Sequence, residues 1–152
     1  MQNRHDNLFE QLEQYRRELL SLVDDVTEKE SNSIPKGFNN NIRWNLGHVY
    51  LDQFSWLQFL TKEKSPVPEN FQKWFGFGTN PNDFDEHTPS LEELKQLLSV
   101  QPQQIKKMYG DRLEVEYSTT EMNMRTIEQV LIRTIFHEGM HFQAILDIKK
   151  FL

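Results

Sequence analysis

Two histidines, His137 and His141, stand four residues apart in a segment with the pattern of a helix. Residues with this spacing lie one turn apart on the same helical face, so both imidazoles can reach one metal ion. The five residues from His137 to His141 also match the H-E-x-x-H signature of zinc metalloproteases. Such a pair can equally be packed in a core and hydrogen-bonded. The interpretation therefore depends on whether the chain offers a third ligand.

A third histidine, His48, lies in the segment from Ile42 to Thr61, which is apolar on most sides. That pattern is typical of a helix surrounded by partners. A lone histidine there is more often a core residue than a ligand, but together with His137 and His141 it completes a set of three. Three neutral imidazoles with an open position are typical of catalytic metal sites. Such ligands suit zinc, nickel, iron or copper; we expect a divalent transition metal, zinc or nickel first.

Two carboxylates accompany the histidines. Asp52 follows His48 by four residues, on the same helical face. It could orient an imidazole, reach the metal through water, or be an ordinary polar residue at the rim of the fold. Glu138 would point about 100° away from His137. We therefore expect Glu138 to be an exposed structural residue rather than a general base, and no catalytic residue is assigned.

The metalloprotease interpretation requires a third ligand after His141. The metzincin spacing, H-E-x-x-H-x-x-G-x-x-H or D, would place a glycine at position 144 and the third ligand at position 147. The chain has Ala144 and Asp147 there. Without the glycine the helix continues. Asp147 then lies about 240° around from His141, away from the histidine pair. The protease remains the minor alternative.

Four segments have the periodicity of helices: residues 6–27, 42–61, about 91–109 and 127–149. Asn39, Asn40 and Asn41 are candidate N-caps of the second segment. Ser90-Leu91-Glu92-Glu93 and Thr126-Ile127-Glu128-Gln129 are capping boxes, which mark the starts of the last two. Pro102 should kink or split the third. The fold class that follows is all-α, an up-and-down four-helix bundle with a long crossover connection between the second and third helices, in a single domain over residues 1–152.

The long connection, residues 63–89, carries five bulky aromatic side chains but no helical period. A connection of this length is uncommon in a compact domain and is often functional. Two interpretations stay open. The segment is a crossover linker held to the bundle by its rings, or it is a lid over a substrate. His87 in this segment and His5 near the N-terminus are expected to be exposed.

Composition excludes several classes. The formal net charge is -6 and no run of lysine or arginine occurs, which argues against nucleic acid and anionic membranes as partners. No stretch approaches the roughly 20 apolar residues of a membrane span, and the polar residues 1–10 are not those of a signal peptide. The chain has no cysteine, which excludes disulfides, zinc-thiolate sites and a cysteine nucleophile. We expect a cytoplasmic protein.

The chain resembles the DinB/YfiT-like superfamily. The resemblance rests on Trp44-Asn45-Leu46-Gly47-His48, on His137-x-x-x-His141, on Phe75-Gly76-Phe77-Gly78-Thr79-Asn80-Pro81 and on the helix start at Ser90. It covers essentially the whole chain. It implies a four-helix bundle, often dimeric, with a divalent metal on His48, His137 and His141. Relatives more often follow the second histidine of the last helix with Arg-Gly or Gly-Gln, and Phe142-Gln143-Ala144 departs from this.

Characterised relatives include thiol S-transferases that use bacillithiol or glutathione, and a mycothiol-dependent maleylpyruvate isomerase. The resemblance therefore implies a metal-dependent enzyme in which the metal activates a low-molecular-weight thiol for attack on an electrophilic substrate. The absence of cysteine fits an external thiol. The alternative is a non-catalytic, metal-stabilised helical module for binding or dimerisation. We expect a homodimer.

Overall fold

The computed structural model describes residues 2–152, and over that range the chain folds into helices and turns without a β-strand. The all-α class is therefore confirmed. The four long helices are α1 (Gln2–Leu22), α3 (Ile42–Thr61), α5 (Leu91–Tyr109) and α6 (Ile127–Lys149). The short ones are α2 (Glu28–Ser31), α4 (Asn70–Phe75) and the 3-10 helix η1 (Pro81–Asp83).

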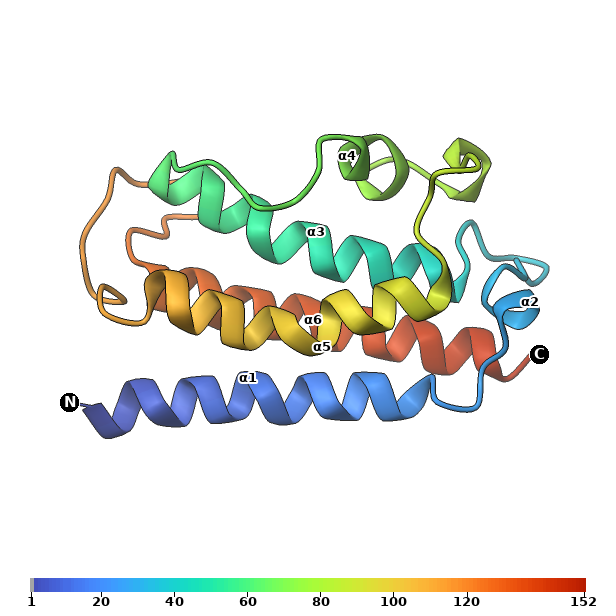
Figure 1. The fold of residues 1–152 in the computed structure, drawn as a ribbon, viewed down its shortest axis with the longest axis horizontal. Coiled ribbons are helices and arrows are strands. Elements are labelled where there is room, and N and C mark those ends of the chain that lie inside the picture. Colours follow the sequence, from blue (N-terminus) through green and yellow to red (C-terminus); the bar gives the residue numbers. More distant parts are fainter. Residues whose placement is uncertain (1) are drawn as a thin grey trace.

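The long helices pack side by side along a common direction (Figure 1). In that view α1 and α6 run from left to right, and α3 and α5 run from right to left. Helix α3 packs most extensively against α6, and α1 packs against α5 and α6. Residues 62–90 return along the outer side of α3, from the end of that helix to the start of α5. No helix in residues 2–152 is both long enough and apolar enough to cross a membrane.

Helix starts follow the predicted caps. Asn41 accepts a hydrogen bond from the backbone N–H of Trp44 at the start of α3, and α5 and α6 begin with the two predicted capping boxes. The end of the first helix was predicted wrongly, because α1 stops at Leu22 rather than near residue 27. Lys149 donates to the Leu22 carbonyl at 2.6 Å and binds Asp25, so a cation from α6 caps this end.

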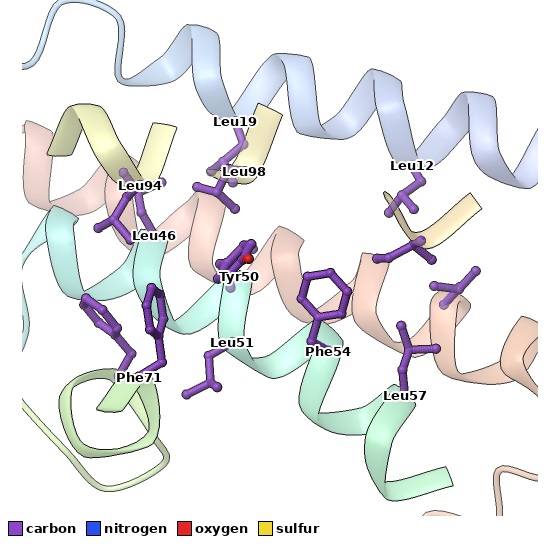
Figure 2. Packing of buried hydrophobic residues seen from close by; sticks show 14 of the residues in the cluster. Leu12, Leu19, Leu46, Tyr50, Leu51, Phe54, Leu57, Phe71, Leu94 and Leu98 are labelled. Atoms are coloured by element: carbon purple, nitrogen blue, oxygen red, sulfur yellow. The ribbon is translucent and has the colours of Figure 1, made fainter. Parts of the chain in front are cut away.

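Apolar side chains from all four long helices meet in one core (Figure 2). Leu19 of α1 lies next to Leu98 of α5, while Tyr50, Phe54 and Leu57 extend from α3 into the same core as Leu12. Burial of apolar side chains is the main favourable contribution to such a bundle. This core holds α3 and α6 in fixed register, which the site between them requires.

A buried arginine crosses the centre of the bundle. Arg16 is 2 % exposed, although charged residues of an amphipathic helix normally lie on its solvent-facing side. Its Nε and one Nη donate to the two carboxylate oxygens of Glu138, at 2.7 and 3.1 Å. The remaining donors reach Leu98 O, Gln101 Oε1 and Gln53 Oε1. All five N–H donors are therefore satisfied, and the expectation of an exposed Glu138 is wrong.

Pro102 lies inside α5 without splitting it. Proline has no backbone N–H, so the carbonyl four residues earlier loses its helical partner. That carbonyl belongs to Leu98, and Arg16 Nη1 donates to it at 2.7 Å. The guanidinium thus replaces the hydrogen bond that proline removes, which explains why the helix continues past this position.

The connection between α3 and α5 is partly ordered into α4 and η1. Phe71, Trp74 and Phe75 of α4 are buried against α3, as expected for a linker held by its rings. Phe77 differs, since 96 % of its side chain is exposed. The segment therefore both packs onto the bundle and presents an aromatic ring to solvent.

Candidate metal centre

The three predicted histidines meet between α3 and α6. These helices lie side by side and run in opposite directions (Figure 1). His48 from α3 faces His137 and His141 from α6, and one ring nitrogen of each lies within 4.8 Å of the others. The ring centroids are 4.5 to 5.1 Å apart. The sequence prediction of a convergent set drawn from two helices therefore agrees with the structure.

Each imidazole has a hydrogen-bond acceptor at its Nδ1 atom. His48 Nδ1 lies 2.7 Å from the carbonyl oxygen of Phe75. His141 Nδ1 lies 2.7 Å from Asn45 Oδ1, and His137 Nδ1 lies 3.0 Å from Asp52 Oδ2. An acceptor at Nδ1 fixes the tautomer with the proton on Nδ1 and leaves a lone pair on Nε2. The three histidines therefore direct Nε2 lone pairs toward a common point.

The spacing of these nitrogens suits a metal ion. The Nε2 atoms of His137 and His141 are 3.2 Å apart. Two imidazoles on a tetrahedral ion, each with a metal–nitrogen bond of 2.0–2.1 Å, would have nitrogens about 3.3 Å apart. With both ring protons on Nδ1, the two Nε2 lone pairs face each other, an arrangement that a cation between them stabilises. The residues present therefore fit a divalent metal.

Burial keeps two of the histidines neutral. It lowers the pKa of His141 to about 3, and the neighbouring His137 and His48 lower it further. Burial likewise lowers the pKa of His48, against the opposing hydrogen bond to Phe75. Metal ligation requires the neutral imidazole. Both rings are therefore in the protonation state that binds a metal at neutral pH.

His48 is positioned by the segment that follows α3. The indole of Trp44 stacks on the imidazole, with ring centroids 4.7 Å apart and planes 9° apart. Trp44 in turn donates from Nε1 to Thr79 at 2.9 Å. Together with the Phe75 carbonyl, these contacts make the orientation of His48 depend on the packing of α4 against α3. A close approach at Gly47 makes that packing possible, because a Cβ there would lie 2.3 Å from the Phe75 ring.

Gly47→Ala should therefore lower both the stability of the fold and the metal affinity, although Gly47 is not itself a ligand. The added methyl group forces Phe75 away from α3, and overpacking of this kind typically costs about 1–3 kcal/mol. Because the Phe75 carbonyl holds His48, we also expect weaker metal binding. Urea unfolding and a metal-competition titration measure the two effects. Gly139→Ala is the control, since a Cβ at this exposed glycine of α6 meets nothing within 4 Å; equal behaviour of the two variants would contradict the prediction.

Asp52 orients a histidine, which settles one of the interpretations left open by the sequence. Its Oδ2 accepts from His137 Nδ1 and, at 2.6 Å, from Arg133 Nη1. Burial alone would raise the pKa of the Asp52 carboxyl, but the hydrogen bond from His137 and the charge of Arg133 outweigh it, so the pKa lies below its usual value. A carboxylate behind a ligand histidine fixes the ring and increases its basicity.

The two acidic residues that the metalloprotease interpretation requires, Glu138 and Asp147, do not join this centre. Glu138 is bound to Arg16 in the core, so its carboxylate is not available as a general base. Helix α6 continues through Ala144 to its end at Lys149. Asp147 accepts hydrogen bonds from Gln143 and Lys150 on the outside of that helix.

The other two histidines do not join the centre. His87 is exposed, as predicted. His5 lies within α1 and is largely covered, so its predicted exposure is wrong, and it lies near Glu114 and Glu128. Arg4 binds both of these carboxylates. Both carboxylates of that cluster are therefore already paired with a guanidinium.

Several residues of the centre were not identified from the sequence. Asn45 and Trp44 belong to the motif that carried the family resemblance, but the pattern alone gave them no role. A polar Asn45 buried in an apolar helix was an available signal. The Phe75 carbonyl could not be identified from the sequence, because every residue type has a backbone carbonyl. Arg133 was not considered, although it lies one turn before His137.

The comparisons with known proteins agree with this geometry. The family model described as the DinB superfamily matches residues 11–145, a range that includes α3, α5 and all three histidines. No curated protein matches the chain. Since the family model covers most of the 152 residues, the chain belongs to the DinB superfamily.

Proposed function

We propose that the protein is a metal-dependent enzyme in which His48, His137 and His141 hold a divalent ion, zinc or nickel, and a low-molecular-weight thiol is transferred to an electrophilic substrate. One observation carries the proposal: all three Nδ1 atoms have acceptors, so three Nε2 lone pairs converge. Histidines that only filled a core would have no reason to present three lone pairs to one another.

In this proposal some residues of the chain bind the metal and others orient the ligands. The three imidazoles are the ligands, and Asp52, Asn45 and the Phe75 carbonyl hold them in orientation. When bound, a divalent ion lowers the pKa of a thiol that reaches it and so supplies thiolate at neutral pH. The chain has no cysteine of its own, so the sulfur nucleophile must come from a small molecule.

The reaction balances without a redox partner. The sulfur of the thiol forms a bond to an electrophilic carbon, and the leaving group departs from that carbon with its electron pair. The thiol proton is released to solvent or to the leaving group. No oxidant or reductant is consumed. The acid–base groups required are those of the thiol and the solvent, which is consistent with the engagement of Glu138 in the core.

Activity with a thiol panel tests this function. We expect the zinc- or nickel-loaded protein to accelerate conjugation of at least one low-molecular-weight thiol to monochlorobimane. Removal of the metal by a chelator should abolish the acceleration, and added metal should restore it. The chelated protein is the control for nonspecific catalysis. Background rates across a broad panel of thiols, with metal bound, would contradict the transferase.

The exposed face of α6 favours a second candidate, the dimerisation module. Ile132, Phe136 and Met140 recur every four residues on this face, and each is more than half exposed. An apolar stripe of this kind is typical of an association surface, and it supports a homodimer. Metal content, measured on protein without a histidine tag, separates the candidates. A bound, exchangeable metal favours the enzyme, and its absence favours the module.

We also propose a crossover topology for the bundle. In Figure 1 α3 and α5 run in the same direction, so the chain must return along the bundle between them. Residues 62–90 are long enough for this and contact α3 on the way. Such a bundle departs from strict up-and-down alternation in this one connection.

A further inference from the structure

We propose that Arg133 binds a carboxylate of the substrate, while the apolar part of the same molecule lies in a hollow formed by Trp56, Phe59 and Phe77. The proposal rests on the function above for its place in a reaction. The binding itself is a separate property, which is measured independently of catalysis. It defines the substrate class as an organic anion with an aromatic or other apolar body.

Arg133 lies next to the histidine centre. Its Nη1 donates to Asp52 Oδ2 at 2.6 Å, and the same oxygen lies 3.0 Å from His137 Nδ1. The guanidinium is thus two hydrogen bonds away from a ligand histidine. It also lies over the indole of Trp56, with Cζ 4.9 Å from the ring centroid. The helices α3 and α6 therefore pair His48 with His141, Asp52 with His137, and Trp56 with Arg133 along one line.

Arg16 and Arg133 differ in how their donors are used. Arg16 is buried and has an acceptor for each of its five N–H groups. Arg133 makes one hydrogen bond to the described residues, through Nη1 to Asp52, and its side chain is 21 % exposed. A guanidinium fork binds carboxylates with two parallel hydrogen bonds. Arg133 therefore keeps donors for a ligand, while Trp56 and Asp52 hold it in place.

Trp56, over whose ring the Arg133 guanidinium lies, also lines a hollow of about 410 Å³. It is lined by Ser55, Trp56, Phe59, Gln72, Phe77 and Glu121. Its volume is within the range of small-molecule sites, about 300–1,000 Å³. Phe77 leaves its ring in water, which costs free energy unless a ligand covers it. The carboxylate of Glu121 disfavours an anion inside the hollow, so the charged end of a ligand would lie toward Arg133.

Charge favours an anion at this place. The three histidines contribute no charge in their neutral form, and Asp52 and Arg133 together contribute none. A bound divalent ion would leave two positive charges uncompensated in a partly buried region. Attraction between opposite charges is strengthened where water is partly excluded. An anionic substrate would compensate part of this positive charge, whereas a neutral analogue would not.

Binding of matched ligands tests the proposal. Phenylacetate and phenylacetamide share a body and differ in charge, and NMR titration of the zinc-loaded protein gives both Kd values. A carboxylate–guanidinium contact should favour phenylacetate by about tenfold or more, and the Arg133 Nε–H resonance should shift. In Arg133→Gln the preference should fall to near one, with phenylacetamide unaffected. Arg133→Lys keeps the charge but loses the fork, so an intermediate preference is expected.

Arg17→Gln is the matched control, because this exposed arginine of α1 carries the same charge away from the site. It should keep the full preference. A wild-type protein without preference, or an Arg133→Gln variant that retains it, would overturn the proposal. The second result would mean that the carboxylate binds the metal or another group. Zinc content and thiol conjugation are measured separately on the same samples, so failure of the metal-dependent function is distinguished from failure of anion binding.

Discussion

Replacing Glu138 with alanine is expected to destabilise the fold by about 3–5 kcal/mol, because it leaves a buried guanidinium without its counter-ion. Arg16 and Glu138 are only 2 % and 3 % exposed. The carboxylate accepts from Nε and Nη2 of Arg16, at 2.7 and 3.1 Å. Water cannot replace these contacts without opening the core, so most of the cost of the unpaired charge should appear in the free energy of unfolding.

The network around this pair links all the long helices. Gln53 of α3 and Gln101 of α5 accept from Arg16 through their side-chain oxygens. Their amide nitrogens donate onward, to Thr134 Oγ1 and to the Tyr50 carbonyl. Loss of Glu138 therefore affects partners on each helix. A fully satisfied polar network of this kind rigidifies a core, whereas a partly satisfied one destabilises it.

Urea unfolding of three variants measures the effect. Glu138→Ala should lower the transition midpoint strongly, and Glu10→Ala, at an exposed position of α1, should change stability by no more than about 0.5 kcal/mol. Arg16→Met combined with Glu138→Leu removes both charges and should recover part of the loss. If Glu138 were instead a general base, its removal would leave stability unchanged or raised and abolish activity. That result would contradict the structural role.

Helix starts could be predicted from the sequence because they depend on local chemistry. Asn41, Ser90 and Thr126 each accept a hydrogen bond from a backbone N–H two or three residues into the helix, and this geometry requires no tertiary contact. The histidine set was predictable for a similar reason, since helical spacing brings His137 and His141 together. His48 joined the set because it lies in a helical segment that is apolar on most sides, and the family resemblance then implied the same three residues.

The buried polar residues could not be predicted, because their environment depends on partners remote in the chain. Arg16 and Glu138 are 122 residues apart, and each alone has the pattern of a residue on the wet face of a helix. The end of α1 at Leu22 depends on Lys149, which is equally remote. The acceptor for His48 is a backbone carbonyl, and every residue type has one. Only the packing of α3, α4 and α6 brings these groups together.

His48→Ala is expected to weaken metal binding by at least about 100-fold. Mutation of a residue that only hydrogen-bonds to a metal ligand typically lowers the metal affinity 10- to 100-fold, and His48 would be a ligand itself. Asp147→Ala should leave the affinity within about twofold, because Asp147 lies on the outside of α6 with Lys150 and Gln143 as partners. The metalloprotease interpretation gives the reverse order, with Asp147 essential and His48 dispensable. Zinc stoichiometry and competition with a chelating dye measure both affinities.

The control for this experiment must separate ligation from packing. His48 is buried under Trp44, so alanine also leaves a cavity that lowers stability. His48→Asn is the better-matched variant, since its amide N–H can donate to the Phe75 carbonyl in place of Nδ1 but offers no nitrogen at the position of Nε2. We expect this variant to unfold, without metal, close to the parent midpoint and still to bind zinc at least about 100-fold more weakly. Parental zinc affinity in both His48 variants, with loss of affinity in Asp147→Ala, would contradict a three-histidine centre between α3 and α6.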